Sequence, residues 1–371
     1  ATLINQGTIS ANLSGQTLSI SGNGVSTFTN QGALEALAGT TLTASAANWS
    51  NAAGATISGT GATVNFNNNW SNAGTVNSTN STLNLGGSFT LAAIGTINRS
   101  GGTVNLTGTL NNTATTFNVG SSTPIGIVTM NGGTIQGGTV QENGGTGLAF
   151  TSSAGILDGV TLRGALDLSA ASSRARIFNG LTLLTEAGGS PGVANVTGSN
   201  AILAFQGTQS LNNATINLGS AGQLNNEGAG TLTLGAGVTV QGSGTIGGQS
   251  FVGGSATLIN QGTISANLSG QTLTIGGNGV STFTNQGALR AVSGGILTIN
   301  PASWSNAGTI AALANSTVNL NGTITTGGLG AFDASAAGAV INVVGTINNA
   351  AQTLTLSPAT GSLTMLGGTI Q

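Results

Sequence analysis

The charged residues are the side chains of this sequence best suited to chemistry, and there are few of them. The 371 residues include five Arg, seven Asp or Glu, and no Lys, His or Cys. Seven of the twelve charges gather between residues 142 and 186: Glu142, Asp158, Arg163, Asp167, Arg174, Arg176 and Glu186. We interpret this cluster as a candidate patch for binding a ligand or a neighbouring molecule. The alternative is a set of solvated turn residues, paired locally, each worth about 0–1 kcal/mol.

Catalysis is not expected from these residues. Without Cys and His, the sequence excludes thiolate nucleophiles, Ser-His-Asp triads and the common zinc sites. Polysaccharide cleavage needs clustered carboxylates or a basic side chain on neighbouring strands, whereas the spacing of Asp158 and Asp167 need not bring them to one face. Asp is also too scarce for a calcium-binding repeat. The sequence therefore predicts no enzyme, no metal and no cofactor.

Nucleic acid and membrane are also poor partners for this composition. A net charge of −2 with five scattered Arg makes no basic footprint for nucleic acid. No run reaches the roughly 18 apolar residues that a spanning helix needs. The opening residues ATLINQGTIS lack a basic start and an apolar signal segment. We therefore expect the chain to begin within mature sequence and to be a piece of a longer protein.

The chain repeats on a long scale of about 255 residues. Residues 1–34 recur at 256–289 with 32 of 34 positions identical. Later, VTMNGGTIQ at 128–136 returns as LTMLGGTIQ at 363–371, an offset that is shorter by about one small unit. We therefore expect one continuous domain in residues 1–371, with a first copy in 1–255 and a partial second copy in 256–371 that lacks about one coil.

A shorter repeat has a step of about 21 residues, a period typical of solenoids. An apolar residue, any residue, Asn and a turn recur in LINQG, FTNQG and WSNAG. The Asn positions are Asn5, Asn30, Asn51 and Asn72 in the first copy and Asn260, Asn285 and Asn306 in the second. One long step and two equal short steps separate them in the first copy, and one long and one short step in the second. The copies thus differ by one whole unit, a change that solenoids accept because each unit contacts only its neighbours.

The residues between the turns favour short strands. Runs such as TLSI, TVNF and TLNL alternate apolar and polar residues, while NQG, NGG and GSG accept the positive φ of tight turns. Apolar residues show no helical periodicity. We predict an all-β fold, a parallel β-helix or β-solenoid of about 17 or 18 coils, whose equivalent strands pair about 4.8 Å apart. Folds of this kind are mostly right-handed, so we expect the right hand here.

Equivalent positions of a solenoid stack into columns. We expect the repeated Asn residues to form a ladder at a turn, of the kind that stabilises cross-β arrays. An aromatic column is expected from Phe28, Trp49, Trp70, Phe283 and Trp304. The long step from Asn5 to Asn30 leaves room for a bulging turn near SGNG at 21–24, which recurs at 276–279.

The motifs NQGTI, WSNAGTV and STLNLGG, repeated at the short step, resemble the filamentous-haemagglutinin-like and autotransporter-passenger β-helices of Gram-negative bacteria. The resemblance covers nearly the whole chain, rests on composition and period, and brings no catalytic or binding motif. It implies an extracellular or cell-surface location. It also implies a role in attachment, aggregation or fibre building.

Individual residues leave alternatives open. Trp49, Trp70 and Trp304 would be sugar-stacking platforms if they faced outward, and core residues if they faced inward. Ranks of Thr order water on ice-binding solenoids, although the rows here mix Thr with Asn, Ser and Gly. Glu35 in the first copy aligns with Arg290 in the second. Because that position accepts either sign, we expect both residues to be exposed and free of charge-specific chemistry.

The leading hypothesis is a non-enzymatic structural or adhesive segment of a bacterial extracellular surface protein or filament. Expected partners are further copies of the chain, end to end or side by side, and a host or matrix glycan or protein. The alternative is a carbohydrate-binding solenoid. The scarcity of charge fits a stack of coils, because a charge would recur about 4.8 Å away and repel its copy, whereas Thr, Asn and Ser hydrogen-bond to theirs.

Overall fold

The chain folds into an all-β parallel β-solenoid of about 17 turns, about 22 residues apart, with almost no helix. The computed structural model describes residues 1–21, 26–358 and 360–371. Each pairing recorded between two named strands is parallel and joins equivalent strands of neighbouring coils, as Asn5 opposite Asn30 and Asn30 opposite Asn51 illustrate. The predicted fold class and coil step are confirmed, and the handedness stays a prediction.

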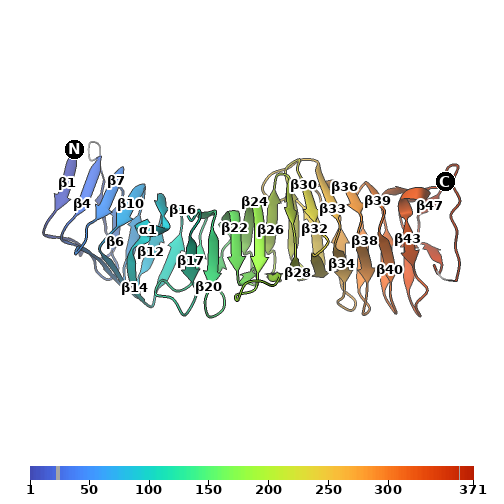
Figure 1. Cartoon of the computed structure of the whole chain (residues 1–371), viewed down its shortest axis with the longest axis horizontal. Coiled ribbons are helices and arrows are strands. Elements are labelled where there is room, and N and C mark those ends of the chain that lie inside the picture. The colour runs from blue at the N-terminus through green and yellow to red at the C-terminus, as the bar shows by residue number, and fades with distance from the viewer. Residues whose placement is uncertain (22–25, 359) are drawn as a thin grey trace. The chain divides into compact units, whose positions relative to one another are not determined.

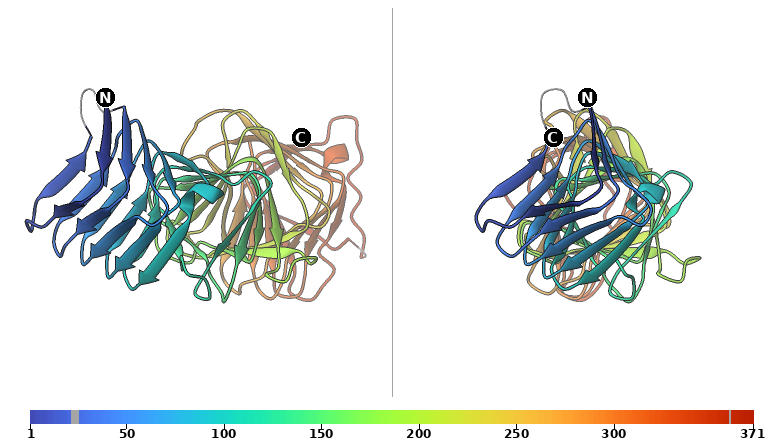
Figure 2. Two further views of the ribbon diagram at one scale, coloured as in Figure 1. Left: turned by 60° about the vertical axis from the view of Figure 1, so that its left-hand side comes forward. Right: turned by 90° about the vertical axis from the view of Figure 1, so that its left-hand side faces the viewer.

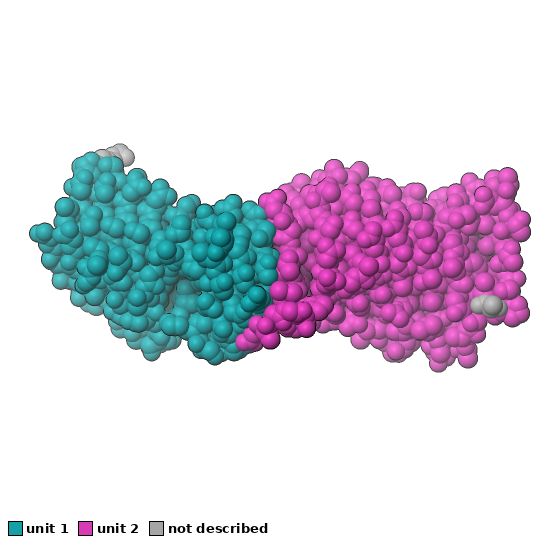
Figure 3. Space-filling view, viewed as in Figure 1, with its two compact units in different colours: residues 1–165 teal, residues 166–371 magenta. Residues whose placement is uncertain are grey.

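The chain divides into two compact units, Ala1–Ala165 and Leu166–Gln371 (Figure 3). The division falls inside the first copy of the long repeat and not at its end at residue 255. The repeated Asn residues of the first copy therefore lie in unit 1, and those of the second copy lie in unit 2.

Unit 1 builds most of its coils from three strands, one on each of three faces (Figure 2). The first face holds β1 (Thr2–Asn5), β4 (Thr27–Asn30), β7 (Asn48–Asn51), β10 (Asn69–Asn72), β13 (Ser88–Thr90), β16 (Thr109–Asn111), β19 (Thr134–Gln136) and β22 (Gly155–Arg163). The second holds β2 (Thr8–Ala11), β5 (Ala33–Ala36), β8 (Thr56–Thr60), β11 (Thr75–Thr79) and β14 (Thr96–Ser100). The third holds β3 (Thr17–Ile20), β6 (Thr41–Ala44), β9 (Thr63–Phe66), β12 (Thr82–Leu85), β15 (Thr103–Leu106), β18 (Val128–Met130) and β21 (Leu148–Phe150). Beyond them, β17 (Thr116–Val119) pairs with β20 (Thr139–Glu142), which pairs with β22.

Unit 2 also has three strands to a coil. One face holds β24 (Arg174–Leu184), β26 (Ile202–Gln206), β29 (Gln223–Glu227), β32 (Gly244–Gly248), β35 (Thr272–Ile275), β38 (Ile296–Ile299), β41 (Thr317–Leu320), β44 (Val340–Val343) and β46 (Leu363–Met365). The next holds β25 (Gly192–Val196), β28 (Ala214–Leu218), β31 (Thr239–Gly242), β34 (Thr263–Ala266), β37 (Ala288–Ala291), β40 (Thr309–Ala312) and β43 (Ala331–Asp333), and the short β23 (Ala165–Asp167) begins at the end of unit 1. The last holds β27 (Gln209–Leu211), β30 (Thr231–Leu234), β33 (Ala256–Asn260), β36 (Val280–Asn285), β39 (Ser303–Asn306), β42 (Thr323–Thr325), β45 (Thr346–Asn348) and β47 (Thr369–Ile370).

The alternation of residues along each strand decides what is inside. In β9, Val64 and Phe66 are buried while Thr63 and Asn65 are half-buried, and β12 and β15 repeat the pattern one and two coils on. Because each strand side chain points to the face opposite its neighbour, one register serves every coil. The interior therefore fills with columns of apolar side chains. The stacked strands that carry them, such as β1, β4, β7 and β10, lie side by side in Figure 1.

Tight corners separate the strands and need backbone that few residues accept. Gly39 (φ 75°) and Asn80 (φ 49°) occupy two of them, in the left-handed region where Gly and Asn are tolerated. The bulging turn expected near residues 21–24 lies largely outside the described residues. Its copy does form a turn, at Asn278 and Gly279, and the register between β33 and β36 shifts by one residue beside it.

Two helices of four residues interrupt the strands at equivalent places. They are α1 (Leu91–Ile94) and α2 (Thr326–Leu329), and each follows the last Asn strand of its copy by one coil. The hydroxyl of Thr90 caps the first and that of Thr325 the second, each accepting a backbone N–H three residues on. The long repeat thus carries an irregular feature as well as regular coils.

Candidate functional site

The repeated Asn residues of unit 1 lie in one hydrogen-bonded column. The Nδ2 of Asn5 donates to Oδ1 of Asn30 (2.7 Å), Asn30 donates to Asn51 (2.7 Å), and Asn51 donates to Asn72 (2.8 Å). All four are buried. Each Nδ2 also reaches a main-chain carbonyl, such as Thr56 for Asn30. An amide that both donates and accepts can satisfy its own copies without leaving a buried polar group unpaired.

Unit 2 holds the second column. Asn260 donates to Asn285 (2.7 Å) and Asn285 donates to Asn306 (2.6 Å), all buried. Within the described residues, Oδ1 of Asn260 has no hydrogen-bond partner. The reason lies one coil earlier, where Leu234 stands opposite Asn260 and offers no donor. The column therefore begins abruptly at Asn260.

Both columns end at a helix. Asn72 donates to the carbonyl of Ile94 at the end of α1 (2.9 Å), and Asn306 donates to Leu329 at the end of α2 (2.8 Å). These are the last residues of the two helices. The helix carbonyl accepts the hydrogen bond that the next Asn of the column would have accepted. The ladder therefore ends without an unused donor.

The aromatic residues lie inside the coils. Trp49 and Trp70 are stacked with ring centroids 5.9 Å apart, and Trp70 stacks on Phe89 at 4.4 Å. Phe66 packs edge-on against both Trp rings at 4.9 and 5.0 Å. Phe28 and Phe283 are fully buried, and Trp304 is 4% exposed.

Their burial decides between the two alternatives for the Trp residues. The indole Nε1 of Trp49, Trp70 and Trp304 donates to the carbonyls of Asn67, Gly86 and Asn321, respectively. A sugar cannot stack on rings whose faces are covered by other side chains. The Trp residues are therefore core residues and not sugar platforms.

Polar residues also form ladders on the outer face of β6, β9, β12 and β15. Asn65 donates to Thr43 (3.0 Å), Asn84 to Asn65 (2.7 Å), and Asn105 to Asn84 (2.8 Å). The outward positions of each strand hold a Thr and then an Asn, as Thr82 and Asn84 do in β12. The amides of these Asn residues are hydrogen-bonded to one another. The solenoid is thus held by neutral ladders on both sides of its wall.

The structure corrects the predicted charged patch at Glu142. Glu142 is 2% exposed, so it is not an exposed member of the patch. Its Oε1 accepts the amides of Gly147 (2.7 Å) and Leu148 (3.1 Å), and its Oε2 accepts that of Ala165 (3.0 Å). Hydrogen bonds from these backbone donors offset the free-energy cost of burying the charge, so the carboxylate of Glu142 has a structural role.

The other charges of the segment are scattered over separate strands and turns. In unit 1, Asp158 stands opposite Gln136 and Arg163 stands opposite Gln141, at different places along β22. In unit 2, Asp167 accepts the amide of Ser169, two residues on (2.9 Å). Glu186 lies exposed in a turn after β24.

Arg174 and Arg176 are the members that the fold brings together, on the outer face of β24 in unit 2. The guanidinium of Arg176 lies 4.7 Å from the ring centroid of Phe251 and 5.3 Å from that of Phe178. The guanidinium of Arg174 lies 6.0 Å from Phe251. Phe251 therefore gathers two cations on one ring, an arrangement that the sequence did not signal because Phe251 is distant in the chain.

A loop over residues 249–254, which we call the strap, places Phe251. The carboxylate of Glu227, fully buried, accepts the amides of Ser250 (2.8 Å), Phe251 (3.0 Å) and Val252 (2.9 Å). Gln249 donates to Gly228, which donates to Val252 (both 2.8 Å). Sequence reasoning missed Glu227, since nothing in QLNNE shows that a later loop returns to it.

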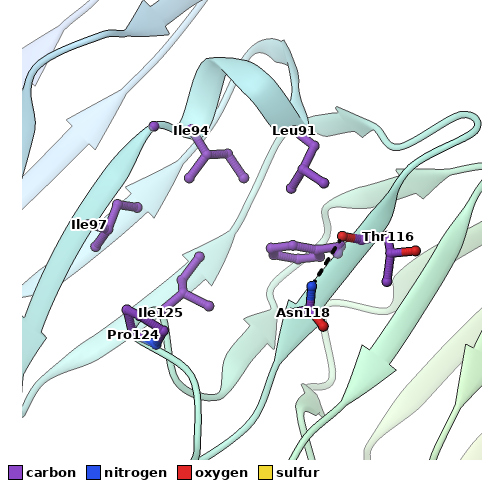
Figure 4. Close-up of a pocket in the computed structure, with 9 residues that line it drawn as sticks. Leu91, Ile94, Ile97, Thr116, Asn118, Pro124 and Ile125 are labelled. Carbon is purple, nitrogen blue, oxygen red and sulfur yellow. Dashed lines mark hydrogen bonds between the residues drawn. The ribbon is translucent and has the colours of Figure 1, made fainter. Parts of the chain in front are cut away.

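Two apolar pockets lie beside the helices, one in each unit. The pocket in unit 1 has a volume of about 320 Å³, and Figure 4 shows Leu91, Ile94, Ile97 and Ile125 pointing into it. The pocket in unit 2, of about 280 Å³, lies under α2. It is lined by Thr326, Leu329, Gly330, Ala331, Phe332, Thr353, Leu354, Thr355 and Thr360. Neither lining contains a charged side chain.

Glu35 and Arg290 occupy matching outward positions. Glu35 is half-buried on β5 and faces Ser10 and Ser58, while Arg290 is exposed on β37 and faces Ser265 and Ala311. Hydroxyl and methyl neighbours make no charge-specific contact. Arg290 is exposed as predicted and Glu35 only in part, and the neighbours of both residues fit a position that tolerates either sign.

Metal-binding clusters and membrane-spanning helices are both absent from the described part of the chain. Over residues 1–21, 26–358 and 360–371, no three or more Asp or Glu side chains gather in a way that could hold a metal ion. In the same ranges, no helix has the length and apolar character needed to cross a bilayer. No protein-family model, no curated protein and no solved structure matches this chain.

Proposed function

We propose that this chain is a non-enzymatic structural and adhesive segment of an extracellular bacterial surface protein or filament. The observation that carries the proposal is the pairing of each coil with near-copies of itself through buried, neutral ladders. Such a wall needs no cofactor, and its length is set by the number of coils. The resemblance of its motifs to filamentous-haemagglutinin-like and autotransporter-passenger repeats supports the extracellular location.

Attachment is the activity that follows from this architecture. The outer faces present repeated Thr, Asn and Ser side chains, which suit many weak contacts with a host or matrix glycan or protein. Further copies of the chain are the other proposed partner. Binding at many equivalent positions adds avidity without a single strong site.

The scaffold role is tested by removing one coil. Deleting residues 49–69 joins Asn48 to Trp70, keeps the NWSN sequence of β10, and lets that strand pair with β4 as β7 does. We expect a soluble protein that unfolds cooperatively, because the second copy of the repeat lacks this coil. Deleting residues 49–58, about half a coil, is the matched control and should abolish cooperative unfolding. If both deletions behave alike, the coils are not interchangeable scaffold units.

The adhesive role needs a separate assay. The chain, displayed on a non-adherent bacterium through an unrelated anchor, should increase attachment to immobilised matrix glycans and proteins and increase cell–cell aggregation. The half-coil deletion displayed at the same level is the control. Attachment and aggregation no greater than with this control would overturn the adhesive role while leaving the scaffold role intact.

A further inference from the structure

Arg174 and Arg176 form a two-cation surface whose charge the recorded contacts leave unmatched. They are two residues apart on one face of β24, and both lie over Phe251. The hydrogen bond recorded for Arg176 goes to the neutral Oε1 of Gln206. Two of the five Arg of the chain thus stand side by side against an aromatic ring that belongs to the strap. Like charges at neighbouring positions repel unless an anion joins them.

The hydrogen-bonding capacity at this place is also unused. Within the described residues, the Nε–H groups of Arg174 and Arg176 and the Oδ1 of Asn225 are buried and have no partner. Buried polar atoms without partners are rare in folded proteins and call for an explanation. The two Nε–H groups are unused donors, whereas Oδ1 of Asn225 is an unused acceptor.

The rings fix how the guanidinium groups face outward. A guanidinium stacked on an aromatic ring presents its edge, where its N–H groups lie, and that edge matches a carboxylate or a sulfate. The guanidinium of Arg176 lies near the rings of both Phe178 and Phe251, and both Arg side chains are only half-buried. Part of each side chain therefore remains open to a ligand.

One amide side chain contacts the cation pair. Oε1 of Gln206 accepts a hydrogen bond from Arg176, and Gln206 lies on β26, the strand that pairs with β24. An amide of this kind hydrogen-bonds the hydroxyl groups of sugars. A basic pair with an amide beside it fits an acidic sugar better than a bare inorganic ion.

We infer that Arg174, Arg176 and the strap residue Phe251 form a binding site for the oxyanion of an acidic saccharide, a carboxylate or a sulfate group. The inference deepens the adhesive function proposed above by naming its ligand class. It differs from that function in depending on one site in unit 2 and not on the repeated faces.

The test measures binding of the purified full chain to polygalacturonate, which carries carboxylates, and to dextran sulfate, with uncharged dextran and inorganic sulfate as further ligands. We expect binding to at least one acidic polymer and none to uncharged dextran. Arg176→Gln should weaken that binding about tenfold or more. Arg290→Gln removes the same charge from a regular coil and should leave it unchanged. Comparing the two polymers identifies the oxyanion.

Several outcomes overturn the inference. These are no binding to either acidic polymer, equal losses in the Arg176→Gln and Arg290→Gln variants, or an effect of inorganic sulfate alone as large as that of the polymers. Thermal unfolding checks that each variant is folded. If Arg176→Gln is not folded, Arg176→Lys, which keeps the charge but not the planar edge, takes its place. Cell attachment that persists without acidic-polymer binding would refute this site and leave the proposed adhesive function standing.

Discussion

The coils that carry Asn5 to Asn72 and the face around Arg176 treat polar side chains in opposite ways. In the first region a buried amide repeats on successive strands and bonds its own copies at 2.7–2.8 Å. In the second, cations stand on one strand and do not recur on the next, where Ile202 and Ala204 face Arg174 and Arg176. An amide both donates and accepts, whereas a guanidinium only donates. Neutral amides can therefore repeat from coil to coil, whereas a cation needs an acceptor or an anion as its partner and not a copy of itself.

Loss of an interior aromatic residue should have the largest effect. Trp70→Ala removes the stack on Phe89 and Trp49 and leaves a cavity in the column. We expect the free energy of unfolding to fall by about 3–5 kcal/mol, measured by urea denaturation. Leu13→Ala, at a residue 69% exposed, is the control and should change it by about 0.5 kcal/mol or less. A loss near the control value would mean that the column does not support its coils.

Breaking the Asn column should cost somewhat less. Asn51→Leu keeps a similar volume but removes the donor to Asn72 and the acceptor for Asn30. We expect a loss of about 2–3 kcal/mol in the free energy of unfolding, because buried polar groups lose their partners. Asn98→Leu breaks the exposed bond to Asn77 and should cost about 0.5 kcal/mol or less. Equal losses would show that burial does not distinguish the two kinds of ladder.

Neutralising the acid under the strap tests the charged region. Glu227→Gln replaces one acceptor oxygen by an N–H₂ group, so backbone amides of Ser250, Phe251 and Val252 lose charge-assisted bonds. We expect a loss of about 2 kcal/mol and faster hydrogen exchange at these amides. Glu35→Gln, at the position that holds Arg290 in the second copy, is the matched control. Unchanged exchange at Phe251 and Val252 would contradict a strap held by Glu227.

The smallest effect concerns Asp333 and pH. The side-chain hydrogen bond from Ser335, and then its backbone N–H, lower the pKa of the Asp333 carboxyl below its ordinary value. Since the folded pKa is depressed, the stabilising contribution is present at neutral pH and is lost as the pH falls through the folded value. Ser335→Ala should raise the pKa of Asp333 toward the ordinary value in an NMR titration. An unchanged pKa would show that the hydroxyl does not act on the carboxylate.

The repeating part of the fold could be predicted because each coil repeats the same sequence pattern. The spacing of Asn5, Asn30 and Asn51 indicates the length of a coil, and the alternation of apolar and polar residues in runs such as TVNF indicates the strands. The large repeat likewise indicated that a whole coil separates the copies. The three strands per coil were left undecided, since the sequence gives the length of a coil but not the positions of all its corners.

The parts that escaped prediction depend on contacts that occur once. Glu142 and Glu227 are buried among backbone donors that only the folded loops bring near. The pairing of Phe251 with Arg176 needs the strap to return across the sheet. A pattern that occurs once gives no period to detect, and these single contacts distinguish the candidate site from the wall that carries it.

The direction of the Asn ladders has an electrical consequence. In the buried column every Nδ2 donates toward the next coil, from Asn5 to Asn30 and onward. In the outer ladder on β9, β12 and β15, each Nδ2 donates toward the preceding coil, as Asn105 does to Asn84. Side-chain amide dipoles in a chain align and polarise one another. Unit 1 therefore contains two aligned rows of dipoles that point in opposite senses along the stack. Lengthening the solenoid by a coil that contributes to both rows adds to each, so the wall can grow without building up a net dipole from its ladders.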